Sequence, residues 1–216
     1  MKVVWLTGDY TGKRKERQRQ AAKSGCDIVI EFHFNAAADQ SASGTEVWYR
    51  SYSIHSQKLA KSVHDHIVAL GFKPRGVKAA VAGTRASFIN AYAPNIWVVL
   101  LEPCFVTNPQ EAQRLHDQAF MQRLAEAIIA GINKFLSEQK VKQVDVIGLS
   151  VGHKGKTSQP DDKGARCVFG DFEADHAEQL AKLVASRLGE KQSQTKGGAM
   201  SNGPAQKVQQ EKGRLI

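Results

Sequence analysis

The sequence predicts an α/β protein with three layers, in which helices cover both faces of a mostly parallel sheet of about six strands. Two observations predict this class. Short runs rich in β-branched and apolar residues alternate along the chain with longer segments in which apolar residues recur at helical spacing. The run at residues 27–33, Asp-Ile-Val-Ile-Glu-Phe-His, follows a Ser-Gly pair and has the composition of a buried strand.

The predicted strands are short apolar runs bounded by polar or glycine-containing turns. Residues 96–101 are almost continuously apolar, which indicates a strand buried on both faces. We also expect strands at residues 2–7, 27–33, 45–49 and 144–151. Residues 73–92 are interrupted by Gly and Pro and indicate neither a strand nor a helix.

The predicted helices are recognised by the spacing of their apolar residues and by the residues at their ends. The segment 53–70 is followed by Gly71, a common residue after a last helical turn. The segment 108–115 has Pro109 in its first turn, where the missing N–H is tolerated. Further helices are expected at residues 13–24, 117–136 and 173–188.

The composition changes after Gly189, where Gln, Lys, Gly and Ser become frequent. Such a segment has too little apolar surface to form a packed core. We therefore expect one folded domain at residues 1–189 and a flexible polar tail at residues 190–216.

The chain carries a formal net charge of +9 at pH 7, which favours an acidic polymer as its partner. Nucleic acid, anionic lipid and an anionic cell wall all fit, and charge alone does not choose among them. No helix-turn-helix, zinc-finger or RNA-binding signature is present, which disfavours nucleic acid. No apolar run reaches the roughly 20 residues of a membrane span, and the first residues lack the pattern of a secretory signal. We therefore expect synthesis in the cytoplasm and no membrane insertion.

The cysteines Cys26, Cys104 and Cys167 are widely separated and form no CxxC pair. An odd number at such spacing is not typical of a disulfide framework or of a cysteine-based zinc site. We expect three buried small side chains, with Cys104 the nearest to the candidate chemistry described next.

Four chemically active side chains occupy the ends of predicted elements. His33, Glu102 and His153 each lie at the carboxyl end of a predicted strand. Glu173 begins the last predicted helix. The carboxyl ends of strands in an open α/β sheet are where ligand crevices form. Zinc hydrolases need about three nitrogen or oxygen ligands, an open position for water and a general base. These four residues are therefore candidates for such a site.

Each of the four also has an ordinary structural interpretation. A buried histidine such as His33 is more often a core residue than a metal ligand. His153 lies in a loop rich in Gly and Lys and could be a solvated loop residue. Glu173 at a helix start could act only on the helix dipole. Glu102 could pair with an arginine, the choices being Arg75, Arg85 and Arg114.

The other histidines are weaker candidates. His176 lies on the same face of the predicted helix as Glu173 and could replace it as a ligand. His64 and His66 form a His-x-His pattern, but side chains two apart on a helix diverge, so we expect both at the surface. His55 and His116 have no suitable neighbours in the sequence.

Several segments occur in an order and at a spacing that resemble a known family. Glu31-Phe-His-Phe-Asn-Ala is similar to a Ser-x-His-x-Asn-Ala strand. A second segment of that family contains Val-Glu, then Gly-Phe, then Asn and an acidic residue. The similar segment here is Leu101-Glu-Pro-Cys-Phe-Val-Thr-Asn-Pro-Gln-Glu-Ala. Gly44-Thr-Glu-Val-Trp-Tyr and Arg75-Gly-Val-Lys also fit. The family is the zinc-dependent N-acetylmuramoyl-L-alanine amidases (Amidase_3), and the resemblance covers residues 1 to about 135.

One part of the family pattern is displaced. The family begins with a strand that ends in Asp-x-Gly-His-Gly-Gly, followed by a glutamate that opens the first helix. Here the similar segment, Val146-Ile-Gly-Leu-Ser-Val-Gly-His-Lys-Gly, comes late in the chain and is followed by Asp171-Phe-Glu and a helix. The next family strand, Lys-Val-x-Leu-Thr-Arg, resembles the segment that starts at Lys2. The resemblance implies a circularly permuted domain with the family's N-terminal strand and helix at residues 144–188, which is physically possible because chain termini often lie close together.

The resemblance also implies a function. His33, His153 and Glu173 would bind Zn²⁺, and Glu102 would be the catalytic glutamate. Residues 1–189 would be a zinc amidase catalytic domain that hydrolyses the amide between N-acetylmuramic acid and L-alanine in peptidoglycan. Together with the basic charge and the absence of a recognisable export signal, this suggests a phage endolysin, a monomer released from the host cytoplasm to lyse the cell wall. A cytoplasmic wall-recycling enzyme or a spore enzyme is the alternative role.

Departures from the family pattern bear on substrate preference more than on metal binding. Glu31 replaces the family's serine, Cys104 replaces a glycine, and Lys154 replaces another glycine, with Lys156 nearby. Two rival interpretations are an inactive peptidoglycan-binding protein and a site completed only between two chains.

Overall fold

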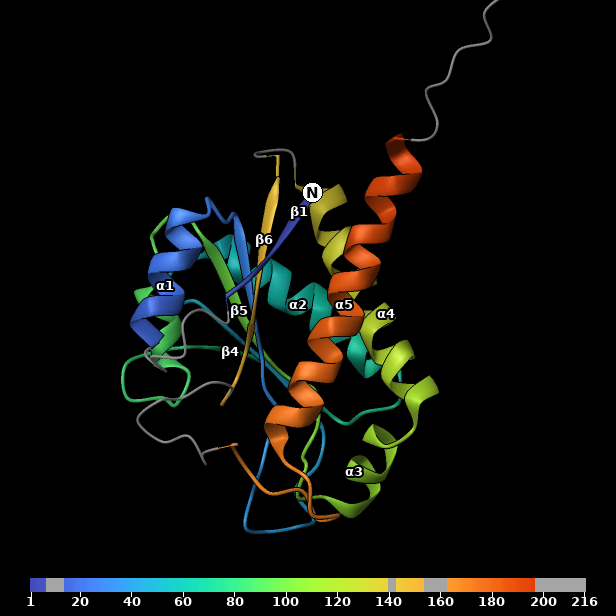
Figure 1. Cartoon of the computed structure of the whole chain (residues 1–216). Coiled ribbons are helices and arrows are strands. Elements are labelled where there is room, and N and C mark those ends of the chain that lie inside the picture. Colours follow the sequence, from blue (N-terminus) through green and yellow to red (C-terminus); the bar gives the residue numbers. More distant parts are fainter. Residues whose placement is uncertain (7–13, 140–142, 154–162, 197–216) are drawn as a thin grey trace, which may run out of the picture.

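The computed structural model describes residues 1–6, 14–139, 143–153 and 163–196. Within these ranges, six strands form one sheet, and helices cover both of its faces (Figure 1). The prediction of an α/β fold with three layers and a mostly parallel sheet is confirmed. Among the described residues, no helix is both long enough and apolar enough to cross a membrane.

The sheet has the strand order β1-β6-β2-β5-β3-β4. The strands are β1 (Lys2–Trp5), β2 (Ile28–Phe32), β3 (Thr45–Tyr49), β4 (Pro74–Ala79), β5 (Trp97–Glu102) and β6 (Val146–Val151). All neighbouring pairs are parallel except β3 and β5, which are antiparallel. A strand from late in the chain, β6, therefore separates two strands from its beginning.

The central strands end level with one another. Ile30 of β2 lies opposite Val99 of β5 on one side and opposite Leu149 of β6 on the other. Every residue of β2 and β5 is buried, as expected for strands covered on both faces. The parallel register brings the carboxyl ends of β2, β5 and β6 to one edge of the sheet, which is where the candidate residues were predicted.

The helices divide unequally between the two faces. One face carries the larger apolar core and is covered by α2 (Ile54–Val68), α3 (Pro109–Leu115), α4 (Gln118–Glu138) and α5 (Glu173–Lys196). The other face is covered by α1 (Arg14–Lys23) and the short 3-10 helix η1 (Ser87–Ala91). In Figure 1, α1 lies on the opposite side of the sheet from α2, α4 and α5.

Helices α2 and α4 touch backbone to backbone at Gly131. A Cβ atom at this position would lie 2.6 Å from Val63 Cα and 3.0 Å from the Ser62 carbonyl oxygen. The hydroxyl of Ser62 also donates a hydrogen bond to the Gly131 carbonyl oxygen, at 2.8 Å. Glycine is thus the residue that permits this close helix crossing.

Two parts of the chain differ from the sequence prediction. The unassigned segment 73–92 contains β4 and η1. β4 begins with Pro74 and is an edge strand paired with β3, where proline is tolerated because one side of the strand needs no partner. Helix α5 continues to Lys196, so the predicted boundary after Gly189 falls inside the helix. The helix can continue through Gly189 because one glycine lowers helix stability by only about 1 kcal/mol. Residues 197–216 of the predicted tail lie outside the described residues.

Candidate active site and metal centre

The predicted ligands His33, His153 and Glu173 come together at the carboxyl edge of the sheet. One ligand atom from each lies within 4.8 Å of the others. His33 Nδ1 is 3.0 Å from Glu173 Oε1, and His153 Nε2 is 3.6 Å from Glu173 Oε2. The two imidazole rings meet edge to face, with their centroids 5.4 Å apart. A single chain therefore brings all three side chains together, without a residue from a second chain.

Two glycines leave the space that this group occupies. A Cβ atom at Gly152 would lie 2.2 Å from Cε1 of His33, which is much closer than van der Waals contact allows. Gly164 has φ +80°, and a Cβ atom there would lie 2.6 Å from Glu173 Oε2. Any larger side chain at these positions would displace a candidate ligand. The glycine that precedes His153 in the sequence is therefore needed for steric reasons.

Backbone amides fix the carboxylate of Glu173. The N–H of Phe34 donates to Oε1 at 3.3 Å, and the N–H of Ala165 donates to Oε2 at 3.2 Å. Burial raises the pKa of this carboxyl, but the hydrogen bond to His33 and the charges of His33 and His153 lower it overall. Burial likewise lowers the pKa of His33, yet the hydrogen bond to Glu173 and the nearby carboxylates raise it overall. Both shifts favour a charged imidazole beside a charged carboxylate, at a separation of 3.0 Å.

Glu102, the predicted catalytic residue, ends β5 beside this group. Phe32 pairs with Leu101, so the next residues, His33 and Glu102, lie next to each other. Glu102 is only 5% exposed, and its Oε2 has no hydrogen-bond partner among the described residues. Burial raises its pKa to about 7, although His33 and Arg85 pull it down. Such a carboxyl can accept and release a proton near neutral pH.

Arg85 connects Glu102 to a second buried carboxylate. Its Nη2 lies 3.4 Å from Glu102 Oε1 and 3.0 Å from Glu46 Oε1, and it donates to Asn35 Oδ1 at 2.9 Å. Glu46 lies directly opposite Glu102 in the β3–β5 pair. Of the three predicted arginine partners of Glu102, the structure brings Arg85 into contact.

The residues that depart from the family pattern have different surroundings in the structure. Glu31 is buried and pairs with Arg17 at 3.2 Å, and it also accepts a hydrogen bond from Tyr92. It forms a separate ion pair on the α1 side of the sheet and is not a fourth ligand. Cys104 is fully buried in the main core. Lys154 and Lys156 lie outside the described residues.

The remaining histidines differ from their predicted surroundings. His64 is only 6% exposed and accepts a hydrogen bond from the Gly76 N–H, so the prediction of a surface residue is wrong. His55 stacks on Trp97 with ring centroids 4.6 Å apart. His176 does not replace Glu173; it joins His116 and Cys167 in a separate group of candidate metal ligands. Sequence reasoning missed that group because its members come from segments with no common pattern.

The fold and the site define an α/β protein with a metal-competent group at the carboxyl edge of its sheet. Residues 3–134 match the sequence model of the family described as Amidase_3, N-acetylmuramoyl-L-alanine amidase. This match covers more than half of the chain, and the chain belongs to this family. His33 and Glu102 lie inside the matched residues, whereas His153 and Glu173 lie beyond them.

Relatives with assigned names are similar over the same part of the chain. The N-acetylmuramoyl-L-alanine amidase LytC of Bacillus subtilis is 31% identical over 132 residues, which are 60% of this chain and 25% of LytC. The germination-specific N-acetylmuramoyl-L-alanine amidase of Bacillus subtilis is 26% identical over 137 residues, which are 62% of this chain and 56% of that protein. The chain spans between a quarter and just under two thirds of the length of the first curated relatives it matches.

Solved structures show the same fold. The N-acetylmuramoyl-L-alanine amidase of Clostridium difficile 630 aligns with a TM-score of 0.53 and 27% identity, covering 59% of this chain and 67% of that one. The CwlD amidase of Clostridioides difficile, solved in complex with the GerS lipoprotein, aligns with a TM-score of 0.52 and 26% identity, covering 58% and 62%.

Proposed function

We propose that the protein hydrolyses the amide between N-acetylmuramic acid and L-alanine in peptidoglycan, with Zn²⁺ as its cofactor. One observation carries the proposal. In a chain that belongs to an amidase family, a buried carboxyl with an unpartnered oxygen lies next to two histidines and a glutamate that converge on one point. An inactive wall-binding protein would have no need for such a costly arrangement of buried polar groups.

The donor set of the site fits zinc. Two imidazoles and one carboxylate are the ligands of many catalytic zinc sites, which keep a further position open for water. His33 Nε2 is buried and has no hydrogen-bond partner in the part of the chain that the structure describes. A set of three ligands beside a free carboxyl oxygen is more consistent with a catalytic metal than with a purely structural one.

The chain's own residues have separate roles in the proposed reaction. The metal, when bound, would polarise the scissile carbonyl and lower the pKa of the attacking water. Glu102 takes the proton of that water and returns it to the leaving amine of L-alanine. Arg85 holds one oxygen of Glu102 at 3.4 Å and leaves the other available for this exchange. The buried position of Glu102 keeps its carboxyl from being fully ionised and solvated in the resting protein.

The proposed reaction is tested by digesting purified peptidoglycan and analysing the products by mass spectrometry. We expect free stem peptides that begin with an unmodified L-alanine, together with glycan strands whose lactyl groups carry no peptide. Chelation should abolish the release and Zn²⁺ should restore it. Products cut between sugars, or cut within the stem peptide, would contradict the proposal. Wall that remains intact in the presence of Zn²⁺ would favour the inactive binding protein instead.

We also propose that β6 and the first part of α5 replace the strand and helix with which the family pattern begins. Three observations support this circular permutation. The family match stops at residue 134, before both elements. β6 pairs with both β1 and β2. Helix α5 packs against β1, β2 and β6. On this proposal, residues 1–189 form the catalytic domain, and one chain is sufficient for activity.

The biological role that we propose is lysis of a host cell by a phage endolysin. The net charge of +9 supports attraction to an anionic wall. The protein would act on peptidoglycan after release from the host cytoplasm. Co-expression in bacteria with and without a holin, a protein that permeabilises the membrane, tests this role: lysis should require both the holin and Glu102. Lysis without the holin would contradict the proposed route of release.

A further inference from the structure

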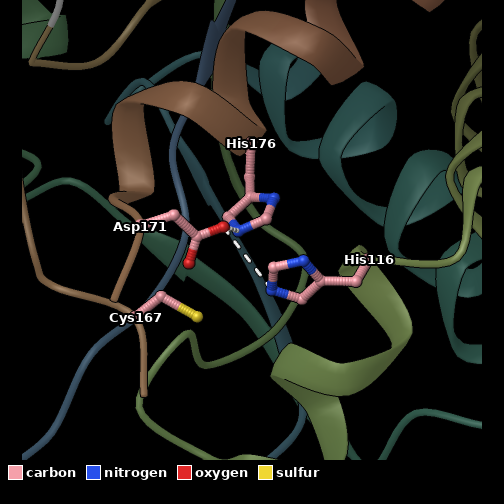
Figure 2. Close-up of side chains that lie close together, drawn as sticks. All are labelled: His116, Cys167, Asp171 and His176. Atoms are coloured by element: carbon pink, nitrogen blue, oxygen red, sulfur yellow. Dashed lines mark ion pairs between the residues drawn. The ribbon is translucent and has the colours of Figure 1, made fainter. Parts of the chain in front are cut away.

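A second group of candidate metal ligands lies outside the proposed active site. It consists of His116, Cys167, Asp171 and His176, and one ligand atom from each lies within 4.8 Å of the others (Figure 2). His116 is the C-cap residue directly after α3, and His176 lies in the first turn of α5. Cys167 and Asp171 come from the segment between β6 and α5. The group shares no residue with the first site.

A tight turn directs Cys167 and Asp171 to the same place. The N–H of Cys167 donates to the Asp171 carbonyl oxygen at 2.8 Å, and the N–H of Gly170 donates to the Cys167 carbonyl oxygen at 3.0 Å. Gly170 has φ +100°, a conformation that favours glycine. The turn is attached to the core by a hydrogen bond from the Val168 N–H to the Val106 carbonyl oxygen, at 3.2 Å. The backbone therefore holds these two side chains in position before any ligand binds.

The polar atoms of the group lie close together and leave part of their hydrogen-bonding capacity unused. Asp171 Oδ2 lies 2.7 Å from His176 Nε2 and 3.5 Å from His116 Nε2. The contact to His176 is close enough for an ion pair when the imidazole is protonated. Among the described residues, neither His176 Nε2 nor Asp171 Oδ1 has a hydrogen-bond partner. His176 is only 4% exposed, so water has little access to this nitrogen.

The chemistry of the four donors is selective. Two imidazoles, one thiol and one carboxylate suit Zn²⁺ and its transition-metal neighbours, whereas Mg²⁺ and Ca²⁺ prefer oxygen ligands alone. Four protein ligands fill a tetrahedral site and leave no open position for a reacting water. The His33 group, with three ligands, keeps such a position. The second group therefore has the composition of a structural site.

We infer that His116, Cys167, Asp171 and His176 bind a second zinc-type divalent ion, which fastens the segment before α5 to the end of α3. This segment includes Ala165, whose N–H holds Glu173 Oε2, and Gly164, which lies against the same carboxylate. The second ion would thus stabilise the position of a ligand of the first site without taking part in the reaction. The inference concerns metal binding and stands apart from the proposed function.

Cobalt substitution tests the second site, because Co²⁺ bound to a thiolate gives a sulfur-to-metal charge-transfer band and the first site contains no cysteine. The full chain is freed of metal with a chelator and titrated with Co²⁺. We expect the band to grow until about one equivalent occupies the cysteine-containing site. It should persist in His33→Ala and disappear in Cys167→Ala. Cys26→Ala is the matched control: it also truncates a buried free cysteine, it lies on the other face of the sheet, and it should keep the band.

A second variant and a second measurement keep the test decisive. If Cys167→Ala fails to fold, His116→Gln replaces it, because the His116 side chain is 41% exposed at a helix end and its loss should spare the fold. This variant should bind one zinc per chain fewer than the wild type, whether or not the first site is filled. A folded wild type that gives no charge-transfer band, or a band that survives in Cys167→Ala, would overturn the inference. Peptidoglycan hydrolysis is measured separately, so failure of the proposed function would be recognised independently.

Discussion

Glu46 and Glu102 lie opposite each other in one strand pair, yet their surroundings drive their pKa values apart. Glu46 contacts Arg75, Lys78 and Arg85, and these cations overcome the effect of burial and lower its pKa to about 2. Glu102 shares only Arg85, and burial dominates, which raises its pKa to about 7. Pairs of carboxyls whose environments separate their pKa values commonly divide structural and catalytic roles. In the proposed reaction, Glu46 is the structural anion and Glu102 carries the proton.

The proposed role of Glu102 can be tested with the variant Glu102→Gln. Glu102→Gln keeps the side chain's shape but removes its ability to accept a proton. We expect hydrolysis of peptidoglycan to fall by roughly 10²–10⁴-fold, with fold and zinc content unchanged. The rate of appearance of free L-alanine amino groups and metal analysis of the purified protein provide the two measurements.

Glu46→Gln serves as the comparison for this variant. It removes the neighbouring carboxylate and leaves three cations without their anion, so it should lower the melting temperature more than Glu102→Gln does. Its turnover should fall less, because Glu46 does not exchange protons with the substrate. If Glu102→Gln hydrolyses peptidoglycan at close to the wild-type rate, Glu102 is not the base.

The sequence predicts the residues of the first site better than those of the second, for a physical reason. His33, Glu102 and His153 stand at strand ends, and the parallel sheet aligns strand ends whatever the connecting loops do. His116 and Cys167 meet because a turn and a helix end pack against each other. Contacts between loops follow no periodic pattern in the sequence, so the sequence does not predict them. The occurrence of Cys167, Asp171 and His176 within ten residues was the one available signal.

At the scale of secondary-structure elements, the crossing of α2 and α4 depends on Gly131. Replacing this glycine by alanine would favour the isolated helix by about 1 kcal/mol. The added Cβ would nevertheless meet the backbone of Val63 at 2.6 Å, and backbone cannot move aside as a flexible side chain can. We expect Gly131→Ala to destabilise the protein by about 1–3 kcal/mol, as overpacking usually does. Thermal unfolding should show a drop of roughly 2–4 °C for each kcal/mol.

Gly189→Ala is the matched control for the helix crossing. Gly189 also lies inside a helix, but among the described residues no atom beyond its chain neighbours and the adjacent helix backbone lies within 4 Å of its added Cβ position. Here only the gain in helix propensity applies, so the melting temperature should stay the same or rise. If both substitutions changed the melting temperature equally, the close approach of α2 and α4 at Gly131 would not limit the stability of the protein.

The elements themselves were predictable wherever one face of each is buried. Strand β5 and helix α4 have clear apolar patterns, and their predicted bounds are close to the observed ones. β4 was missed because it is an edge strand that starts with Pro74 and has no fully buried residue. The end of α5 was misplaced because Gly189 suggests a stop, whereas the helix continues through it.

At the scale of the whole molecule, the proposed permutation predicts that the chain can be reordered. Opening the chain between Gln139 and Val144, and joining Gly189 to Lys2 through a short Gly-rich linker, would restore the family's order of elements. Both Met1 and Leu188 pack on the same apolar core, which favours a short connection. We expect this variant to fold, to bind zinc and to hydrolyse peptidoglycan.

The control for the reordered chain uses the same linker but opens the chain inside α4, between Gly131 and Ile132. This cut divides the helix that packs on α2, and the variant should fail to fold. Circular dichroism, metal analysis and turbidity loss on cell walls compare the two. An insoluble or inactive Gln139–Val144 variant would argue against the permutation.

The position of β6 has a consequence for how the protein is made on the ribosome. β1 and β2 are synthesised early, but they do not pair with each other, since β6 lies between them. When residue 139 has emerged, only four neighbouring strands, β2-β5-β3-β4, are available to form a continuous sheet. At that stage His33 is present without His153 or Glu173. A nascent or truncated chain that ends before Glu173 therefore cannot assemble this group of ligands, and the proposed hydrolysis requires synthesis to continue past Glu173.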